Sequence, residues 1–255
     1  MVPEARRSGG CDRIMEAVVL AGGLGTRLGD LTRETPKPMV PVRNRPFLEY
    51  LLEYWKEQGV REFVLSVGYR HEVIERYFGA EFKGCPVRYS LETEPLGTGG
   101  GLLQSLDQVR GKDFLVLNGD TFFAVPLTAF RNFYLQKNAQ AAMALFEVPA
   151  RDRYEGVELG AEDQIRDFIP RGDSRTCRYA NGGVYLISRT LLAGWKRGER
   201  KSLEKDFWPE WIRTAKAVYG FPAEQTFIDI GTPEDYTRAE QVLNTFIKPR
   251  GKEQS

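Results

Sequence analysis

The sequence of 255 residues contains a single histidine, His71, and three cysteines, at positions 11, 85 and 177. Three widely separated cysteines exclude a disulfide framework and a CxxC metal site. One histidine excludes a His-rich zinc site, and a Ser-His-Asp triad would have to use that residue. His71 stands at the start of a predicted helix over 71–78, where a surface side chain is favoured. The chemistry therefore has to rest on carboxylates, lysines, arginines and backbone amides.

A strong net charge and a long apolar run are also absent. Lys and Arg number 36 and Asp and Glu number 35, which gives a net charge of +1. That balance disfavours a nucleic-acid partner bound by bulk attraction, which needs a basic face. No apolar run approaches the ~20 residues that span a bilayer, and Met1–Asp12 lacks the apolar stretch of a secretory signal. We therefore expect a cytoplasmic protein with neither a nucleic-acid nor a membrane partner.

The hydrophobic pattern of the first half predicts alternating strands and helices. Strands are predicted over 16–20, 62–67, 87–91 and 113–117, and helices over 47–58, 99–106 and 127–136. This alternation is typical of a Rossmann-like α/β fold, in which a mainly parallel sheet is flanked by helices.

The pattern changes character after residue 140. Short strands with turns between them favour antiparallel or mixed pairing, and they are predicted over 141–148, 156–159, 164–168 and 183–187. Helices are predicted near 203–214 and 233–247. Because no linker or internal repeat interrupts the chain, we expect a single domain over 15–247, between flexible tails at 1–14 and 248–255.

The strongest chemical signal is the segment LAGGLGTRL (20–28), which follows the first predicted strand. Glycines at such a place let the backbone turn and aim its amides at a phosphate. The segment fits neither the dinucleotide pattern nor the Walker pattern. Arg27 and Lys37 supply two cations for one anion, and Pro36 and Pro38 stiffen the backbone around Lys37. A surface loop with ordinary charges is the alternative, which the joint occurrence of these features disfavours.

Together with four further motifs, this segment resembles the signature of the sugar-1-phosphate nucleotidyltransferases, over roughly residues 15–247. In chain order, those motifs are EPLGTGG (94–100), LNGD (117–120), NGGVY (181–185) and FIDIGTP (227–233). The stretches PFLEYLL, LSVGY, LNGDTFF and SLEKDF are similar to the D-glycero-D-manno-heptose 1-phosphate guanylyltransferases in particular. The resemblance implies the nucleotide-diphospho-sugar transferase type of fold, a nucleoside triphosphate and a sugar 1-phosphate as substrates, and a homo-oligomer as an option.

Two acids, Asp120 and Asp229, each follow a predicted strand. Mg²⁺ prefers a few carboxylates together with substrate phosphate oxygens, so the pair predicts a magnesium site. Either residue alone would fit a turn or a helix N-cap better. The metal interpretation therefore depends on both residues and on their meeting Lys37.

The nucleotide is expected to contact the glycine loop, the segment around Glu92 and the end of the predicted strand over 113–117. The residues assigned to it are Leu20, Ala21, Gly22, Gly23, Gly25, Thr26, Glu92, Pro95, Gly97, Thr98, Asn118 and Gly119. By resemblance, Glu92 falls where thymidylyl- and uridylyl-transferring relatives often have Gln. A carboxylate only accepts hydrogen bonds, and guanine offers N1–H and N2–H₂ side by side. This favours GTP, although uracil also offers one N–H donor.

Arg171, Asn181 and Gly182 are assigned to the sugar phosphate. Asn181 can bond to sugar hydroxyls, and a left-handed turn at this residue is the alternative. Relatives usually have Phe-x-Glu-Lys where this chain has FIPR (168–171), and Arg-Tyr-Gly where it has RYEG (153–156). Arg171 can replace the lysine, but a proline cannot supply the carboxylate that holds sugar hydroxyls.

These assignments predict transfer of GMP from GTP to a sugar 1-phosphate, with release of pyrophosphate. D-glycero-D-manno-heptose 1-phosphate is the expected acceptor, for the synthesis of a surface glycan such as lipopolysaccharide or capsule. Arg27 and Lys37 are the expected catalytic cations, and the ionised sugar phosphate needs no general base. The alternatives are a mannose-1-phosphate guanylyltransferase, an amino-sugar-1-phosphate uridylyltransferase and a non-catalytic regulator that binds nucleotide sugars.

Overall fold

A computed structural model describes residues 15–23, 35–148, 154–170, 173, 175, 177–214, 216–231 and 233–246. The tails expected at 1–14 and 248–255 lie outside the described residues.

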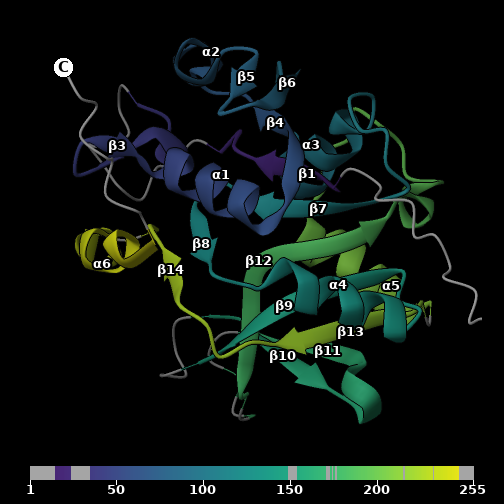
Figure 1. The fold of residues 1–255 in the computed structure, drawn as a ribbon. Helices are drawn as coiled ribbons and strands as arrows, with labels where there is room; N and C mark the ends of the chain where they lie inside the picture. The colour runs from purple at the N-terminus through teal and green to yellow at the C-terminus, as the bar shows by residue number, and fades with distance from the viewer. Residues whose placement is uncertain are drawn as a thin grey trace, which may run out of the picture.

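One mixed sheet forms the centre of the molecule (Figure 1). Its strands follow the order β11-β10-β12-β7-β1-β4-β6-β5, and β9 pairs with β12 and with β13. Strands β7, β1, β4 and β6 are parallel neighbours, whereas β12 is antiparallel to both β7 and β9. The strands of this sheet are β1 (Met15–Leu20), β4 (Val60–Val67), β5 (Glu81–Phe82), β6 (Cys85–Leu91), β7 (Asp113–Asn118), β9 (Ala141–Glu147), β10 (Gly156–Leu159), β11 (Ile165–Ile169), β12 (Tyr179–Ser188) and β13 (Val218–Pro222).

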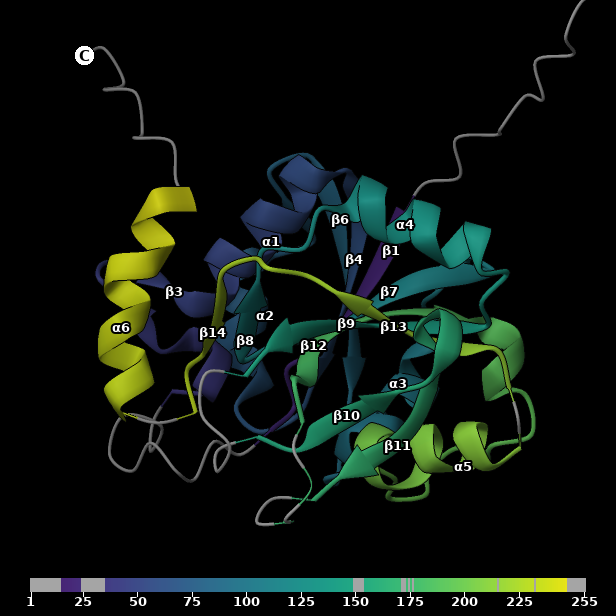
Figure 2. The same ribbon diagram turned by 90° about the horizontal axis from the view of Figure 1, so that it is seen from below.

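Helices cover both faces of the sheet, α1 and α4 on one face and α3 and α5 on the other (Figure 2). The alternation along β1 matches these layers. Ala17 and Val19 belong to the apolar cluster of α1 and α4, whereas Val18 packs in the cluster that contains Trp208 of α5. The helices are α1 (Phe47–Gln58), α2 (His71–Phe78), α3 (Gly97–Ser105), α4 (Leu127–Gln136), α5 (Trp208–Arg213) and α6 (Pro233–Leu243).

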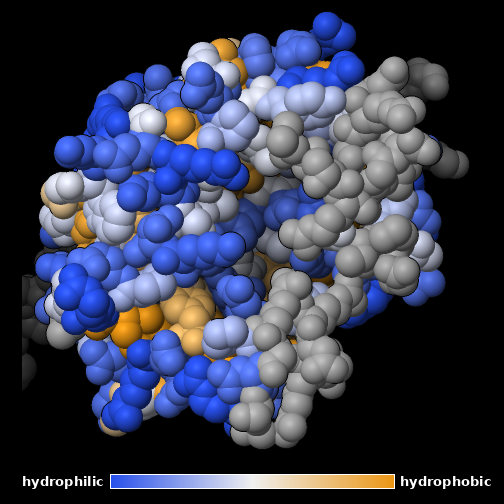
Figure 3. All heavy atoms as spheres, turned by 180° about the vertical axis from the view of Figure 1, so that it is seen from behind, coloured by the Kyte–Doolittle hydropathy of each residue, from blue (hydrophilic) through white to orange (hydrophobic). Residues whose placement is uncertain are grey.

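Two short pairings lie outside the main sheet. Strand β2 (Pro41–Val42) pairs with β3 (Arg45–Pro46), and β8 (Thr121–Phe123) pairs with β14 (Phe227–Asp229). On the face opposite to that of Figure 1, hydrophilic residues predominate and hydrophobic ones form small patches (Figure 3). Among the residues that the structure describes, no helix combines the length and apolar character needed to cross a bilayer.

The predicted fold class, a mixed sheet with helices on both faces, is confirmed. Helices α1, α2 and α4 have the predicted bounds. The sequence pattern does not predict β8, which is too short to show a period, or β13. Strand β13 contains a glycine and a proline, which are turn signals, yet it pairs in parallel with β9.

Buried Glu16 fixes the start of β1, the strand that carries the glycine loop at its other end. Its side chain accepts hydrogen bonds from Arg88 Nη2 at 2.8 Å, from the backbone N–H of Arg110 at 2.9 Å and from the backbone N–H of Gly111. Arg88 also pairs with Glu62 at 2.5 Å. One carboxylate thus joins β1 to β6 and to the segment before β7.

We expect Glu16→Ala to lower the free energy of unfolding by about 1–3 kcal/mol, because two backbone donors lose their acceptor. Glu62→Ala is the matched control, since Arg88 keeps Glu16 in that variant, and it should cost less. Urea unfolding measures both values. Equal losses in the two variants would show that the backbone contacts of Glu16 contribute little.

Candidate active site

The pairing of β8 with β14 brings the two predicted acids together, although 108 residues separate them in the chain. Asp120 lies in the turn between β7 and β8, and Asp229 is the last residue of β14. Asp229 stands opposite Thr121 in the antiparallel ladder, and the N–H of Ile230 donates to the carbonyl of Asp120 at 3.1 Å. Figure 1 shows β8 and β14 side by side at one edge of the fold. The backbone pairing therefore sets the two carboxylates next to each other.

The ammonium group of Lys37 contacts both acids. Its Nζ lies 2.5 Å from Asp120 Oδ2 and 3.7 Å from Asp229 Oδ1. Lys37 begins a 3₁₀ turn over Lys37–Met39, which the carbonyl of Pro36 closes by accepting from the N–H of Met39 at 2.7 Å. The Lys37 side chain is 13% exposed, so the protein holds its charge at one place. Asp229 Oδ1 also accepts from the N–H of Gly231 at 2.7 Å, so the turn interpretation applies to this acid as well.

A cavity of about 410 Å³ opens beside Lys37 and Asp120 at the carboxyl ends of β1 and β7. Its lining contains most of the residues assigned to the nucleotide. The lining residues are Leu20, Ala21, Gly22, Gly23, Lys37, Pro38, Glu92, Pro95, Gly97, Thr98, Asn118, Asp120 and Arg200. Gly119 lies behind this wall, where a Cβ would stand 2.8 Å from the carbonyl oxygen of Leu20. Gly25, Thr26, Arg27 and Arg171 lie outside the described residues.

Glu92 is held within the wall of the cavity by the protein itself. Its Oε1 accepts from Ser66 Oγ at 2.9 Å and its Oε2 from the N–H of Leu96 at 3.1 Å. A Cβ at Gly22 or at Gly101 would stand 2.6 Å from Oε1, so both glycines make room for this carboxylate. Burial raises the pKa of Glu92, against the opposing effect of its two hydrogen bonds.

The glycines at 97, 99 and 100 face the segment 199–201 of the chain. The carbonyl of Lys201 accepts from the N–H groups of Gly99 and Gly100 at 2.9 and 3.2 Å. Gly97 has a φ of +73°, and a Cβ there would stand 2.5 Å from the same carbonyl oxygen. The glycines therefore allow this close approach, which delivers Arg200 to the wall of the cavity.

The predicted sugar residues Asn181 and Gly182 do not line this cavity. Asn181 lies within β12, where its Nδ2 donates to Tyr185 Oη at 2.8 Å and its Oδ1 accepts from the N–H of Gly183 at 2.9 Å. The ring of Phe123 fills the space that a side chain at Gly182 would need. Gly183, with a φ of +70°, takes the left-handed conformation that was the alternative for Asn181.

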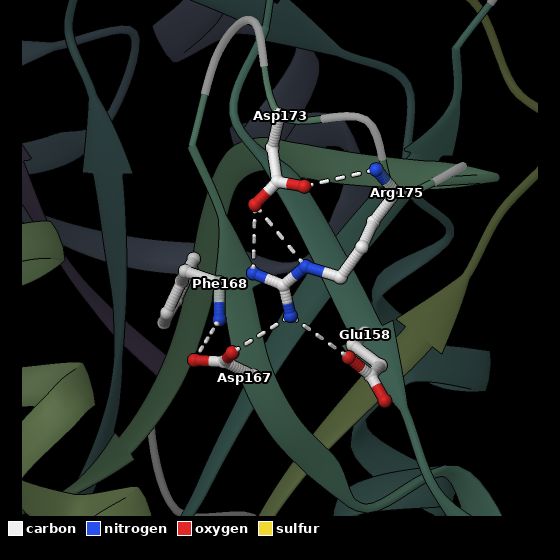
Figure 4. A network of polar contacts seen from close by, with 5 residues as sticks. All are labelled: Glu158, Asp167, Phe168, Asp173 and Arg175. Carbon is white, nitrogen blue, oxygen red and sulfur yellow. Dashed lines mark hydrogen bonds and ion pairs between the residues drawn. The ribbon is translucent and has the colours of Figure 1, made fainter.

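A network around Arg175 surrounds the start of the FIPR segment at Phe168 (Figure 4). Its guanidinium donates to Asp167 at 3.1 Å, to Asp173 at 3.1 and 3.2 Å and to Glu158 at 3.4 Å. The backbone N–H of Arg175, and then its guanidinium, lower the pKa of Asp173. The network ties together residues that precede and follow the FIPR segment.

A larger cavity of about 1090 Å³ lies elsewhere, and Glu16, Lys112 and Arg189 contribute to its lining. Glu16 and Lys112 lie at the amino ends of β1 and β7, away from Lys37 and the two acids. Ligands of open α/β sheets bind outside the carboxyl ends of the strands. We therefore take the smaller cavity as the candidate active site.

A family model described as "Nucleotidyl transferase" matches residues 16–245. The chain belongs to this nucleotidyl transferase family. This confirms the resemblance drawn from the five motifs. The D-glycero-alpha-D-manno-heptose 1-phosphate guanylyltransferase of Aneurinibacillus thermoaerophilus is 37% identical over 91% of this chain and 100% of its own length. The enzyme of the same name from Campylobacter jejuni is 39% identical over 87% of this chain and 97% of its own length.

A solved structure with a similar fold is that of HddC from Yersinia pseudotuberculosis complexed with GMP-PN. It is 30% identical, has a TM-score of 0.79 and covers 89% of this chain and 99% of its own. The similarity therefore spans the candidate site of this nucleotidyl transferase as well as its sheet.

Sequence reasoning assigns no role to Arg200 or Glu204. Arg200 lines the cavity, and Glu204 accepts from Thr98 Oγ1 at 2.9 Å. Glu204 belongs to the SLEKDF stretch (202–207), whose similarity to the guanylyltransferases indicates no function for a particular residue. The SLEKDF stretch directly follows Lys201, and the contact of Lys201 with the glycines of α3 brings the stretch close to the cavity.

The raised pKa of Glu92 predicts a pH-dependent effect of Glu92→Gln on stability. The folded protein keeps this proton to a higher pH than the unfolded chain does. The stability of the wild type therefore falls as pH rises from the pKa of Glu92 in the unfolded chain to its higher pKa in the folded protein. Glutamine does not titrate, so the stability of Glu92→Gln relative to wild type should increase from about pH 4 to about pH 7. Urea unfolding at both pH values measures this change. Glu94→Gln controls for the loss of one charge from the segment, and a pH-independent difference for Glu92→Gln would contradict the effect of burial.

Proposed function

We propose that the protein transfers a guanylyl group from GTP to D-glycero-alpha-D-manno-heptose 1-phosphate, giving a GDP-sugar and pyrophosphate. The observation that carries the proposal is the contact of Lys37 with both Asp120 and Asp229 at the edge of a cavity lined by residues 20–23, the described part of the glycine loop. The substrates are those for which the two relatives are named. We take the reaction to be cytoplasmic and to supply surface glycan synthesis.

The reaction forms a bond between a phosphate oxygen of the sugar 1-phosphate and the α-phosphorus of GTP, and breaks the bond from that phosphorus to the β-phosphate. The nucleophile is already an anion, so the protein has to neutralise charge and align two phosphates. We assign Lys37 to the α-phosphate, where its ammonium offsets the repulsion between the two anions. Backbone amides at Gly22 and Gly23 are assigned to the triphosphate, together with Gly25, Thr26 and Arg27.

The two carboxylates fit a divalent cation. The ammonium of Lys37 already lies within 4 Å of both, so a positive charge is stable at this point. The Asp120 and Asp229 side chains are 38% and 29% exposed, which leaves them open to further ligands. No larger cluster of acidic, His or Cys side chains suited to a metal occurs among the described residues, and two carboxylates with substrate oxygens are what Mg²⁺ prefers. The chemistry that such an ion supplies is charge neutralisation on the phosphates.

We assign the guanine to the part of the cavity formed by Glu92, Pro95, Gly97 and Thr98. Ser66 and Leu96 use one lone pair on each oxygen of Glu92. A carboxylate can accept about four hydrogen bonds, so acceptor capacity remains for the N1–H and N2–H₂ groups of guanine. The guanidinium of Arg200 adds hydrogen-bond donors to the same wall. Asn181, Gly182 and Arg171 are assigned to the sugar phosphate, as the sequence suggests.

The test is release of pyrophosphate from GTP, ATP, UTP and dTTP, each combined with heptose, mannose, glucose and N-acetylglucosamine 1-phosphates. We expect the GTP and heptose pair to have the highest kcat/KM. A higher value for mannose, or for UTP with the amino sugar, would favour the corresponding alternative enzyme. Nucleotide-sugar binding without turnover of any pair would favour a regulator.

We further expect Lys37→Ala and Asp120→Asn each to lower kcat by about 10²-fold or more, because each removes a charge that faces the reacting phosphates. Both variants should retain the wild-type circular dichroism spectrum, since the side chains lie at the edge of a cavity rather than in the core. Lys112→Ala is the matched control, because it removes an exposed lysine at the other end of β7. Turnover at the wild-type rate in folded Lys37→Ala would refute the assignment.

A further inference from the structure

Glu204 accepts hydrogen bonds from side chains on both sides of the proposed site. Its Oε2 accepts from Thr98 Oγ1 and from Ser202 Oγ, both at 2.9 Å, and its Oε1 accepts from Tyr185 Oη at 3.4 Å. Thr98 lines the nucleotide cavity. Tyr185 is fully buried, and its Oη accepts a hydrogen bond from Asn181 Nδ2. One carboxylate thus reaches both substrate regions.

The ionised carboxylate fixes the direction of these hydrogen bonds. A carboxylate has no proton to give, so all three hydroxyls have to donate to it. Their lone pairs are then left to accept from other donors. Thr98 Oγ1 accepts from the N–H of Leu203 at 2.8 Å, and Ser202 Oγ accepts from the N–H of Lys205 at 3.1 Å.

The same argument fixes the amide of Asn181. Because Tyr185 gives its only proton to Glu204, its oxygen has to accept, and Asn181 Nδ2 is the donor at 2.8 Å. The amide oxygen of Asn181 then points the other way and accepts from the N–H of Gly183. Burial, and next the charge of Glu204, raise the pKa of Tyr185, which keeps the phenol protonated and able to donate.

The backbone around Glu204 is well held. The residue lies in a π-helical turn over Leu203–Phe207, a conformation found often at functional sites. The N–H of Ser202 donates to Asp206 Oδ2 at 2.7 Å, which closes the turn at its start. The carboxylate is therefore fixed relative to α3 on one side and β12 on the other.

We propose that Glu204 is a positioning residue, which orients Thr98 for the nucleotide and, through Tyr185, Asn181 for the sugar phosphate. The inference rests on the proposed function. Glu204 would then be one residue that orients side chains in both the nucleotide region and the sugar-phosphate region.

The test is Glu204→Gln, which keeps the size of the side chain and replaces one acceptor by a donor. Whichever way the new amide turns, at least one hydroxyl loses its acceptor, and when the amide nitrogen faces Tyr185 it competes with Asn181 Nδ2 for the phenol oxygen. We expect KM to rise about tenfold for both GTP and the sugar 1-phosphate, with a smaller change in kcat. Lys205→Gln, in the same turn but with an exposed side chain, is the matched control and should leave both KM values unchanged.

Single-sided variants separate positioning from a general structural effect. Thr98→Val should raise KM more for GTP than for the sugar 1-phosphate, and Tyr185→Phe should raise KM more for the sugar 1-phosphate than for GTP. In the Glu204→Gln background, Tyr185→Phe should add little, because both changes act through the same amide. Additive effects of the two, or a rise of KM for one substrate only in Glu204→Gln, would overturn the inference.

Thermal unfolding followed by circular dichroism checks that each variant folds. If Glu204→Gln does not fold, Thr98→Val and Tyr185→Phe decide the matter, since equal effects of each on both substrates would contradict the scheme. Absence of turnover by the wild-type protein with every substrate pair would refute the proposed function. Normal wild-type turnover with an unaffected Glu204→Gln would refute only the role of Glu204.

Discussion

The site depends on the repulsion between two carboxylates and on the cation that relieves it. Backbone pairing of β8 with β14 forces Asp120 and Asp229 together, whatever charge they carry. In a partly buried setting, two neighbouring like charges repel each other, and a positive charge is needed beside them to offset that repulsion. The ammonium of Lys37 meets that need from a distant part of the chain. The three groups alone keep one net negative charge, so the site can still attract a further cation.

Under the proposed function, this charge balance also suits the substrates. A divalent cation would turn the net charge of the three side chains from negative to positive, and an anionic α-phosphate would then bring it close to neutral. The side chains can stay almost in place through these changes, because β8, β14 and the 3₁₀ turn hold them through backbone hydrogen bonds. A site that is already arranged loses little free energy to reorganisation when charge develops.

The sequence predicts the layers of the fold and the meeting of Lys37 with the acids, and it does so for physical reasons. The glycine loop and Asp120 follow parallel strands and Asn118 ends one, and the carboxyl ends of these strands share one edge of the sheet. Asp229 is predicted to follow a short apolar strand at 226–228, and it is the last residue of the three-residue strand β14. Such a short strand shows no period of its own, and the pairing of β14 with β8 is what sets Asp229 beside Asp120. Arg200 and Glu204 stayed unassigned, because their importance comes from one long-range backbone contact between Lys201 and α3.

The glycines of the nucleotide motifs also make room for other parts of the protein. The sequence assigns Gly97 to the nucleotide, and a Cβ on Gly97, Gly99 or Gly100 would also meet the segment 199–201. Gly22 likewise leaves room for the carboxylate of Glu92 rather than only for a phosphate. In each case the missing side chain lets protein pack against protein, and that packing places a charged group, Arg200 or Glu92, in the cavity wall. The glycines thus act on the ligand through the neighbours they admit, so their substitution should disturb recognition even where no glycine touches the substrate.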